Sequence, residues 1–146
     1  MDMMAGLKAS FSGLNAQKMR MNIIASNLAN VNTTRTPEGG PYRRKEAIFA
    51  AQPRIDSFEA LLRGRLQDGI REARVIDIVN DPQGTRLEYD PNHPDANAQG
   101  FVTLPNINLM REMVDLMLAS RSYEANVTAI NALKEMALRA LQIGRI

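Results

Sequence analysis

The sequence predicts an α+β fold, in which two long N- and C-terminal helices pair as a coiled-coil-like hairpin with a small β-rich insert between them. Apolar residues recur every seven positions at both ends of the chain, and the centre is rich in β-branched residues, Pro and Gly. A seven-residue spacing places side chains on one face of a helix, as in a coiled-coil seam. Each helix therefore needs a partner for its stripe, and the spacing leaves open whether this is the other helix or a neighbouring copy.

The first helix is expected over residues 3–31. Asp2 precedes it and can cap its start, where a negative charge suits the positive end of the helix dipole. The apolar stripe of this helix, which we take as a candidate assembly surface, consists of Leu7, Leu14, Met21 and Leu28. A run that contains Pro and Gly at residues 36–41 then ends the helical pattern.

Asparagines gather where this first helix should end, and two of them, Asn27 and Asn30, are further candidate assembly residues. Asn has a modest helix propensity, so the stretch can be no more than a frayed helix end. A buried Asn can also fix the register of two helices by hydrogen bonding between them, as it does in coiled coils. The sequence leaves both interpretations open.

The central part of the chain is expected to be β-rich and irregular. The strands are expected at residues 47–50, 74–79, 86–89 and 101–104, and the second is the clearest because it is rich in β-branched residues. Residues 81–84 read as a turn, and residues 90–100 read as a loop because they are rich in Pro, Asn and Asp. The segment 57–66 is ambiguous: Phe58, Leu61 and Leu62 have helical spacing, but Gly64 and Gly69 interrupt it, so we expect a loop or a short helix.

The second helix is expected over residues 107–143, with Asn106 or Asn108 as its cap. Its candidate assembly residues are Leu116, Tyr123, Val127 and Ile130, on a stripe that begins at Leu109. A helix of roughly 37 residues is about 55 Å long, so a small insert cannot cover its apolar face. The chain is thus divided into an N-terminal helix (1–34), an insert (35–106) and a C-terminal helix (107–146).

Composition excludes several classes of function. The 146-residue chain has no Cys, so disulfides, thiolate metal sites and Cys nucleophiles are excluded. A net charge of +2 is too small a surplus to imply nucleic acid as a partner. No stretch approaches the length of an apolar membrane span, and the start lacks the pattern of a cleaved signal peptide. We expect no direct membrane insertion and no cofactor.

Candidate catalytic or metal-binding residues are few. His93 is the only His, and its neighbours Asp90 and Asp95 suggest a metal site or a general base. A lone His between two Pro residues in a loop is more often structural, and Asp77 and Asp81 read as a strand edge and a turn. No catalytic triad, phosphate-binding loop or paired-carboxylate motif is present. We therefore predict no catalytic, cofactor-binding or metal-binding residues, and no enzymatic activity.

Several motifs resemble a known family. Near the N-terminus these are GLNAQ at residues 13–17 and NIIASNLANVNT at residues 22–33, and near the C-terminus SRSYEANV at residues 120–127. They resemble the terminal motifs of flagellar rod, hook and hook-associated axial proteins. The central motifs are GGPYRRK at residues 39–45, YDPNHPDA at residues 89–96 and GFVTLPNIN at residues 100–108. These resemble the flagellar basal-body rod proteins of the proximal rod.

This resemblance implies a structural subunit that assembles with other rod subunits and with itself into the drive shaft between motor and hook. It implies contacts with the motor (MS) ring, the rod-junction protein and the flagellar export apparatus. It also implies export without a cleaved signal peptide and a location in the periplasmic basal body. The alternative functions are a soluble coiled-coil adaptor or export chaperone, and a peptidoglycan hydrolase, for which the sequence offers no catalytic constellation.

Overall fold

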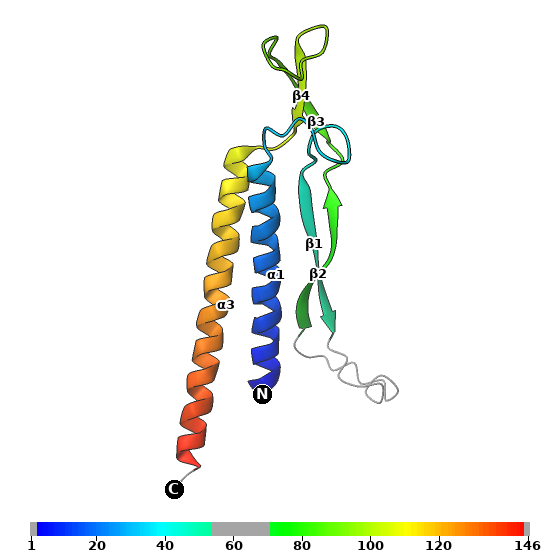
Figure 1. Ribbon diagram of the computed structural model, residues 1–146. Coiled ribbons are helices and arrows are strands. Elements are labelled where there is room, and N and C mark those ends of the chain that lie inside the picture. Colours follow the sequence, from blue (N-terminus) through cyan, green and yellow to red (C-terminus); the bar gives the residue numbers. More distant parts are fainter. Residues whose placement is uncertain (1–2, 54–70, 145–146) are drawn as a thin grey trace, which may run out of the picture. The chain divides into compact units, whose positions relative to one another are not determined.

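The computed structural model describes residues 3–53 and 71–144, and it confirms the predicted α+β fold (Figure 1). Along the chain, one long helix precedes and another follows a small insert of antiparallel strands. The elements are α1 (Met3–Ala29), β1 (Lys45–Pro53), β2 (Arg71–Asn80), β3 (Thr85–Tyr89), β4 (Phe101–Pro105) and α3 (Leu109–Ile143). The strands form two sheets of two strands each, β1 with β2 and β3 with β4.

Helix α1 ends at Ala29, two residues earlier than the sequence predicted, and Asn30 explains why. The Asn30 side chain donates from Nδ2 to the carbonyl oxygen of Ser26 (2.8 Å), which also accepts from the Asn30 backbone N–H (3.1 Å). The Thr33 hydroxyl in turn donates to Asn30 Oδ1 (3.1 Å). Such local side-chain bonds compete with helix continuation. Asp2, the predicted cap, lies outside the described residues.

Helix α3 begins at Leu109, two residues later than predicted, because Asn108 caps it. The backbone N–H of Arg111 donates to Asn108 Oδ1 (3.1 Å), and the N–H of Glu112 donates to the Asn108 carbonyl (3.0 Å). A side-chain oxygen that accepts from the backbone N–H three residues further along the chain is the usual N-cap arrangement. Asn108 is therefore the cap, out of the two candidates that the sequence offered.

The four expected strands are all present, and each is longer than predicted. In the second sheet, β3 and β4 pair antiparallel from Thr85 opposite Pro105 to Tyr89 opposite Phe101. The segment 57–66, expected as a loop or a short helix, lies outside the described residues.

The loop between β3 and β4 is closed by Gly100. The Asp90 N–H donates to the Gly100 carbonyl (3.0 Å), and the Tyr89 and Phe101 rings meet edge to face at 5.3 Å. Gly100 has a φ of +81°, and a Cβ there would lie 2.9 Å from Tyr89 Cε2 and 3.3 Å from Pro91 Cβ. Only glycine fits here. Any other residue would be strained in this left-handed backbone conformation, and its Cβ would clash with the Tyr89 ring.

The chain divides into two compact units, and each unit contains part of both helices and part of the insert. Unit 1 comprises Met1–Met19, Phe49–Ile76 and Ala119–Ile146, and unit 2 comprises Arg20–Ile48 and Asp77–Leu118. The predicted three-part division follows the order of elements, and as a set of domain boundaries it stays a prediction.

The buried residues are unevenly divided between the units. In unit 1 the buried side chains among the described residues are Ala16 and Ala119. In unit 2 they include both apolar and polar groups: Ile23, Ile24, Asn27, Tyr42, Val102, Pro105, Ile107 and Glu112. Unit 2 therefore contains most of the core that this chain builds by itself.

Candidate functional site

A buried polar cluster, formed by Asn27, Tyr42, Arg44 and Glu112, lies in unit 2. Asn27 comes from the last turns of α1, Glu112 from the first turn of α3, and the other two from the segment that leads into β1. Asn27 and Glu112 are each 1% exposed. Buried polar groups of this kind are costly unless they are fully hydrogen-bonded.

Asn27 uses all of its hydrogen-bonding capacity. Its Nδ2 donates to the Lys45 carbonyl (2.9 Å) and to Glu112 Oε2 (3.1 Å), and its Oδ1 accepts from the Lys45 N–H (2.9 Å) and the Tyr42 hydroxyl (3.1 Å). An amide side chain has two donor hydrogens and two acceptor lone pairs, so no position is left over. Of the two interpretations of the asparagines, hydrogen bonding between helices therefore holds for Asn27, while Asn30 bonds locally at the helix end.

Glu112 is neutralised by Arg44. The Arg44 Nε donates to Glu112 Oε1 (2.7 Å), a charge-assisted bond, and its Nη1 also reaches Glu46 (3.3 Å). Burial alone would lower the pKa of Arg44, but the hydrogen bond and charge of Glu112, followed by those of Glu46, outweigh it, so the pKa is raised. The backbone carbonyl of Arg44 accepts from the Asp81 N–H (2.8 Å), so this segment is fixed on two sides.

His93 and Asp95 make hydrogen bonds within the loop and to the segment that follows α1. The backbone N–H of Asp95 donates to His93 Nδ1 (3.1 Å), which is the arrangement of a structural His. The Asp95 carboxylate accepts from the Thr34 hydroxyl (2.6 Å) and pairs with Arg35. The Thr34 hydrogen bond, supported by the charges of Arg35 and His93, lowers the pKa of Asp95.

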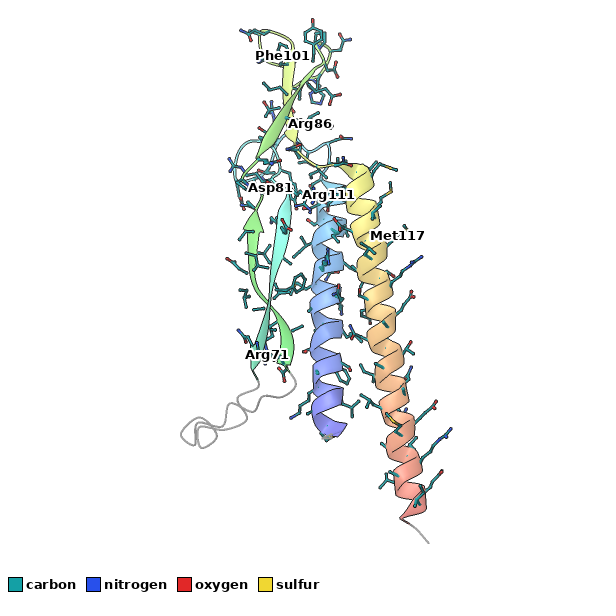
Figure 2. The ribbon with its side chains drawn as sticks, turned by 180° about the vertical axis from the view of Figure 1, so that it is seen from behind. Arg71, Asp81, Arg86, Phe101, Arg111 and Met117 are labelled. Carbon is teal, nitrogen blue, oxygen red and sulfur yellow. The ribbon has the colours of Figure 1, made fainter. Side chains whose placement is uncertain are left out.

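Asp77 and Asp81 also make local bonds. Asp77 Oδ1 accepts from the Ile78 N–H (2.8 Å) within β2, and Asp81 Oδ1 accepts from the Gln83 N–H (2.8 Å) in the turn that follows. Asp81 lies at the end of the β2 strand, where Figure 2 labels it. Over residues 3–53 and 71–144 no group of His, Asp or Glu is arranged to hold a metal ion.

The helices of unit 1 approach one another at small residues. A Cβ on Gly6 would lie 3.6 Å from Leu133 Cδ1, and a Cβ on Gly13 would lie 3.2 Å from both polar atoms of the Asn126 side chain. Gly6 and Gly13 are also seven residues apart, one position before the predicted stripe. The predicted stripe stays a prediction, and on the line beside it the missing side chains of Gly6 and Gly13 leave room for Leu133 and Asn126 of α3.

The predicted assembly residues are mostly half-covered by their own chain. Asn27 is buried; those partly covered are Leu7, Leu14, Met21, Leu28, Asn30, Leu116, Tyr123, Val127 and Ile130. Part of each side chain is therefore already in contact within the chain. The role of these residues in contacts between copies stays a prediction.

Sequence reasoning placed Met113 beside the predicted stripe but missed the rest of a more exposed apolar surface on α3, which we call the α3 stripe. It consists of Met110, Met113, Val114 and Met117, which are 68, 40, 51 and 60% exposed. Figure 2 shows Met117 on the outer side of the helix. The positions i, i+3, i+4 and i+7 form one continuous helical face. The signal was present, since residues 109–118 are polar only at Arg111, Glu112 and Asp115.

Further large apolar side chains are exposed on the helices within unit 1. On α1 these are Phe11 and Met19, at 54 and 44% exposure, and on α3 they are Met136, Leu138, Leu141 and Ile143, at 50 to 74%. Neither helix, over its described residues, is long and apolar enough to cross a membrane. A chain with this much uncovered apolar helix surface fits a subunit whose helices are completed by other subunits.

Comparison with known proteins identifies the family. The family model described as "Flagella basal body rod protein" matches residues 7–35, and the one described as "Flagellar basal body rod FlgEFG protein C-terminal" matches residues 98–143. The two matches cover most of α1 and of α3, together with the segments that lead out of one helix and into the other.

Relatives match over almost the full length. The flagellar basal-body rod protein FlgC of Borreliella burgdorferi is 44% identical over 98% of each chain. That of Bacillus subtilis is 44% identical over 95% of this chain and 96% of its own, and that of Salmonella typhimurium is 40% identical over 92% of each. The chain therefore belongs to the FlgC family of flagellar basal-body rod proteins, and it is a structural rod subunit rather than an enzyme.

Proposed function

We propose that this chain builds the proximal part of the rod, where it self-assembles with other rod proteins into the drive shaft that transmits torque from motor to hook. The observation that carries this proposal is the α3 stripe, a complete apolar helix face that the described chain leaves open. Fully burying one side chain of this size contributes about 1.5–3 kcal/mol. Several such side chains per subunit can therefore hold neighbouring helices together.

The geometry of assembly follows from the asymmetry of the subunit. Where the α3 stripe of one copy packs on the exposed α1 residues of the next, the two surfaces are unlike and no two-fold axis relates the two copies. Contacts between unlike surfaces generate rings or open helical assemblies, and a rod is of the second kind. Stiffness would then arise from many buried helix contacts rather than from any one strong bond.

The individual binding partners follow from the position of such a subunit in the basal body. A proximal subunit meets the motor (MS) ring and the rod-junction protein as well as other copies of rod proteins. To reach the periplasm it passes through the flagellar export apparatus without a cleaved signal peptide. These partners are supported by the family resemblance, and none of them requires a cofactor.

The experiment compares Met117→Asp with Met117→Leu in cells that lack their own copy of the gene. We expect the Asp variant to be absent from purified basal bodies and the cells to be non-motile, because assembly would bury an unpaired charge. The Leu variant keeps the surface apolar and should assemble normally. Normal incorporation of the Asp variant would contradict the role of the α3 stripe.

A second measurement tests the location. An epitope inserted beside Asn92, in the exposed loop between β3 and β4, should appear by cryo-electron microscopy in the rod next to the motor ring. A label found in the cytoplasm, with intact rods that lack it, would instead support the soluble adaptor or export chaperone. Leu116→Asp and Ile130→Asp should also block incorporation, but Met117 is the cleaner site because it is more exposed.

A further inference from the structure

The contact between Asn27 and Lys45 has the form of a strand pairing. In an antiparallel ladder, two opposed residues exchange both of their N–H···O=C bonds. Here the Lys45 N–H donates to Asn27 Oδ1 and the Lys45 carbonyl accepts from Asn27 Nδ2, both at 2.9 Å. A carboxamide offers the same donor and acceptor as a peptide group. One side chain of α1 thus occupies the place of a residue on a neighbouring strand.

Lys45 is at the edge of the β1–β2 sheet where this bond forms. The preceding carbonyl, that of Arg44, accepts from the Asp81 N–H (2.8 Å) just after β2, so the chain faces its partner strand there. Backbone groups of successive strand residues point to opposite sides of the strand. The groups of Lys45 therefore point away from β2, and without Asn27 they would be an open strand edge.

The Asn27 carboxamide is held in one orientation. Tyr42 donates to its oxygen and Glu112 accepts from its nitrogen, and both Asn27 and Glu112 are 1% exposed. A reversed amide would set two donors against each other at Lys45 and place an acceptor against the Glu112 carboxylate. Because every neighbour favours the same orientation, the pairing with Lys45 is fixed rather than occasional.

A second strand edge receives a similar bond from the same helix. In unit 1 the backbone N–H of Ala73, in β2, donates to the Ser12 hydroxyl (3.1 Å) of α1. Ser12 in turn donates to the carbonyl of Ala9, so its oxygen is oriented toward the strand as an acceptor. Helix α1 therefore presents polar side chains to strand edges at two places, with two bonds at Asn27 and one at Ser12.

We propose that Asn27 is a strand-edge cap: it substitutes for a neighbouring strand at Lys45 and so closes this edge to strand addition by a second copy of the chain. Open edges are templates for pairing with another chain, and proteins close them by several devices. Subunits that assemble side by side at high local concentration are especially exposed to such pairing. The cap restricts their contacts to helix surfaces, and it ties the position of β1 to α1 and, through Glu112, to α3.

The test uses the full-length chain with Asn27→Leu, which keeps the size of the side chain and removes its hydrogen bonds. We expect the Lys45 N–H to exchange with solvent at least about tenfold faster, while the Asp81 N–H on the β2 side changes little. We also expect concentration-dependent association with an intermolecular β-sheet signal in the infrared spectrum. Asn30→Leu is the matched control, because the Asn30 side chain bonds only within residues 26–33, and it should behave as wild type.

A second variant covers the case in which Asn27→Leu loses protection at both amides because the unit unfolds. The pair Asn27→Asp with Glu112→Gln reverses the donor and acceptor between positions 27 and 112 and keeps an acceptor for the Lys45 N–H. The Lys45 carbonyl then faces a carboxylate oxygen in place of its donor, and Arg44 bonds a neutral amide oxygen at position 112. We expect normal protection of the Lys45 N–H together with more β-type association than in wild type.

Two results would overturn the proposal. One is an Asn27→Leu chain that folds and keeps wild-type protection at Lys45, which would mean that the carboxamide does not hold this edge. The other is a double variant that associates no more than wild type, which would mean that the open edge does not recruit a second copy. In either case Asn27 would be a residue of the core and not a strand-edge cap.

Discussion

Units 1 and 2 are built from the same two helices, yet they are held together by different chemistry. In unit 2, Asn27 and Glu112 are buried and every polar atom of the Asn27 side chain has a partner. In unit 1, Gly6 and Gly13 of α1 lie against Leu133 and Asn126 of α3, and large apolar side chains remain exposed. Unit 2 has a polar core that is closed within the chain, and unit 1 has none among its described residues, while both units leave apolar surface exposed, in unit 2 at the α3 stripe.

The difference shows how a subunit can be both specific and incomplete. A buried polar network tolerates one arrangement only, because any shift leaves donors or acceptors unpaired in a medium of low dielectric constant. Contacts between small and apolar side chains tolerate several arrangements at similar cost. Unit 2 can therefore fix the register of the two helices, and unit 1 can adapt to neighbouring subunits.

The largest expected effect comes from removing the charge partner of Glu112. Arg44→Met should leave a buried carboxylate without its ion pair, which typically costs about 3–5 kcal/mol of unfolding free energy. Urea unfolding of the full chain, followed by circular dichroism, measures the loss. Arg74→Met is the matched control, because the Arg74 side chain is 62% exposed and pairs with Glu72 at the surface. The control should change stability by less than about 1 kcal/mol.

A double variant separates the charge from the packing. Arg44→Met with Glu112→Gln leaves no buried charge, and the amide oxygen introduced at position 112 can still accept from Asn27 Nδ2. It should therefore recover much of the stability that Arg44→Met loses. If the double variant is as unstable as the single one, the role of this pair is in shape and not in charge, and the contrast between the units is weaker than we infer.

Much of this architecture could be predicted from the sequence, and the limits have physical causes. Both helices and all four strands were expected, since periodicity and residue type are local signals. The C-terminal end of α1 and the start of α3 each lie two residues from the predicted position, because side-chain hydrogen bonds of Asn30 and Asn108 determine them and helix propensity does not. The partner of Asn27 could not be predicted, because Glu112 is 85 residues away in the chain. Apart from Met113, the α3 stripe was not predicted, because the seven-residue spacing selects a different helix face.

A smaller effect tests whether the β3–β4 arm of unit 2 is independent of its polar cluster. Gly100→Ala should cost about 1–2 kcal/mol from the left-handed backbone and more from the contact with Tyr89 Cε2. Gly39→Ala is the control, since Gly39 has a φ of +90° and a Cβ at this position would have nothing within 4 Å, so it reports the backbone cost alone. Hydrogen exchange should show the Gly100→Ala defect within residues 85–105, with normal protection of the Lys45 N–H.

A smaller effect again is expected from the two glycines of unit 1. In a helix, replacing Gly by Ala gains about 0.8–1 kcal/mol of intrinsic propensity. Gly6→Ala should show that gain as a higher melting temperature, because its Cβ would meet Leu133 at an ordinary contact distance. Gly13→Ala should gain less or lose stability, because Asn126 must move away from a Cβ at 3.2 Å. Equal gains at the two positions would mean that unit 1 adapts even more freely than the comparison suggests.

The smallest effect concerns the ion pair of the loop in unit 2. Because the Thr34 hydrogen bond and the charges of Arg35 and His93 lower the pKa of Asp95 below its ordinary 3.8, the ionised carboxylate stabilises the fold. That contribution is fully present above pH 3.8 and is lost as the pH falls through the lower, folded-state pKa. The stability difference between wild type and Asp95→Asn, measured from about pH 7 to about pH 2, should therefore be constant and then narrow in acid. Thr34→Val should weaken this pH dependence. If the stability difference between wild type and Asp95→Asn persists unchanged into strong acid, Asp95 acts through shape, as the contacts of unit 1 do, and not through charge.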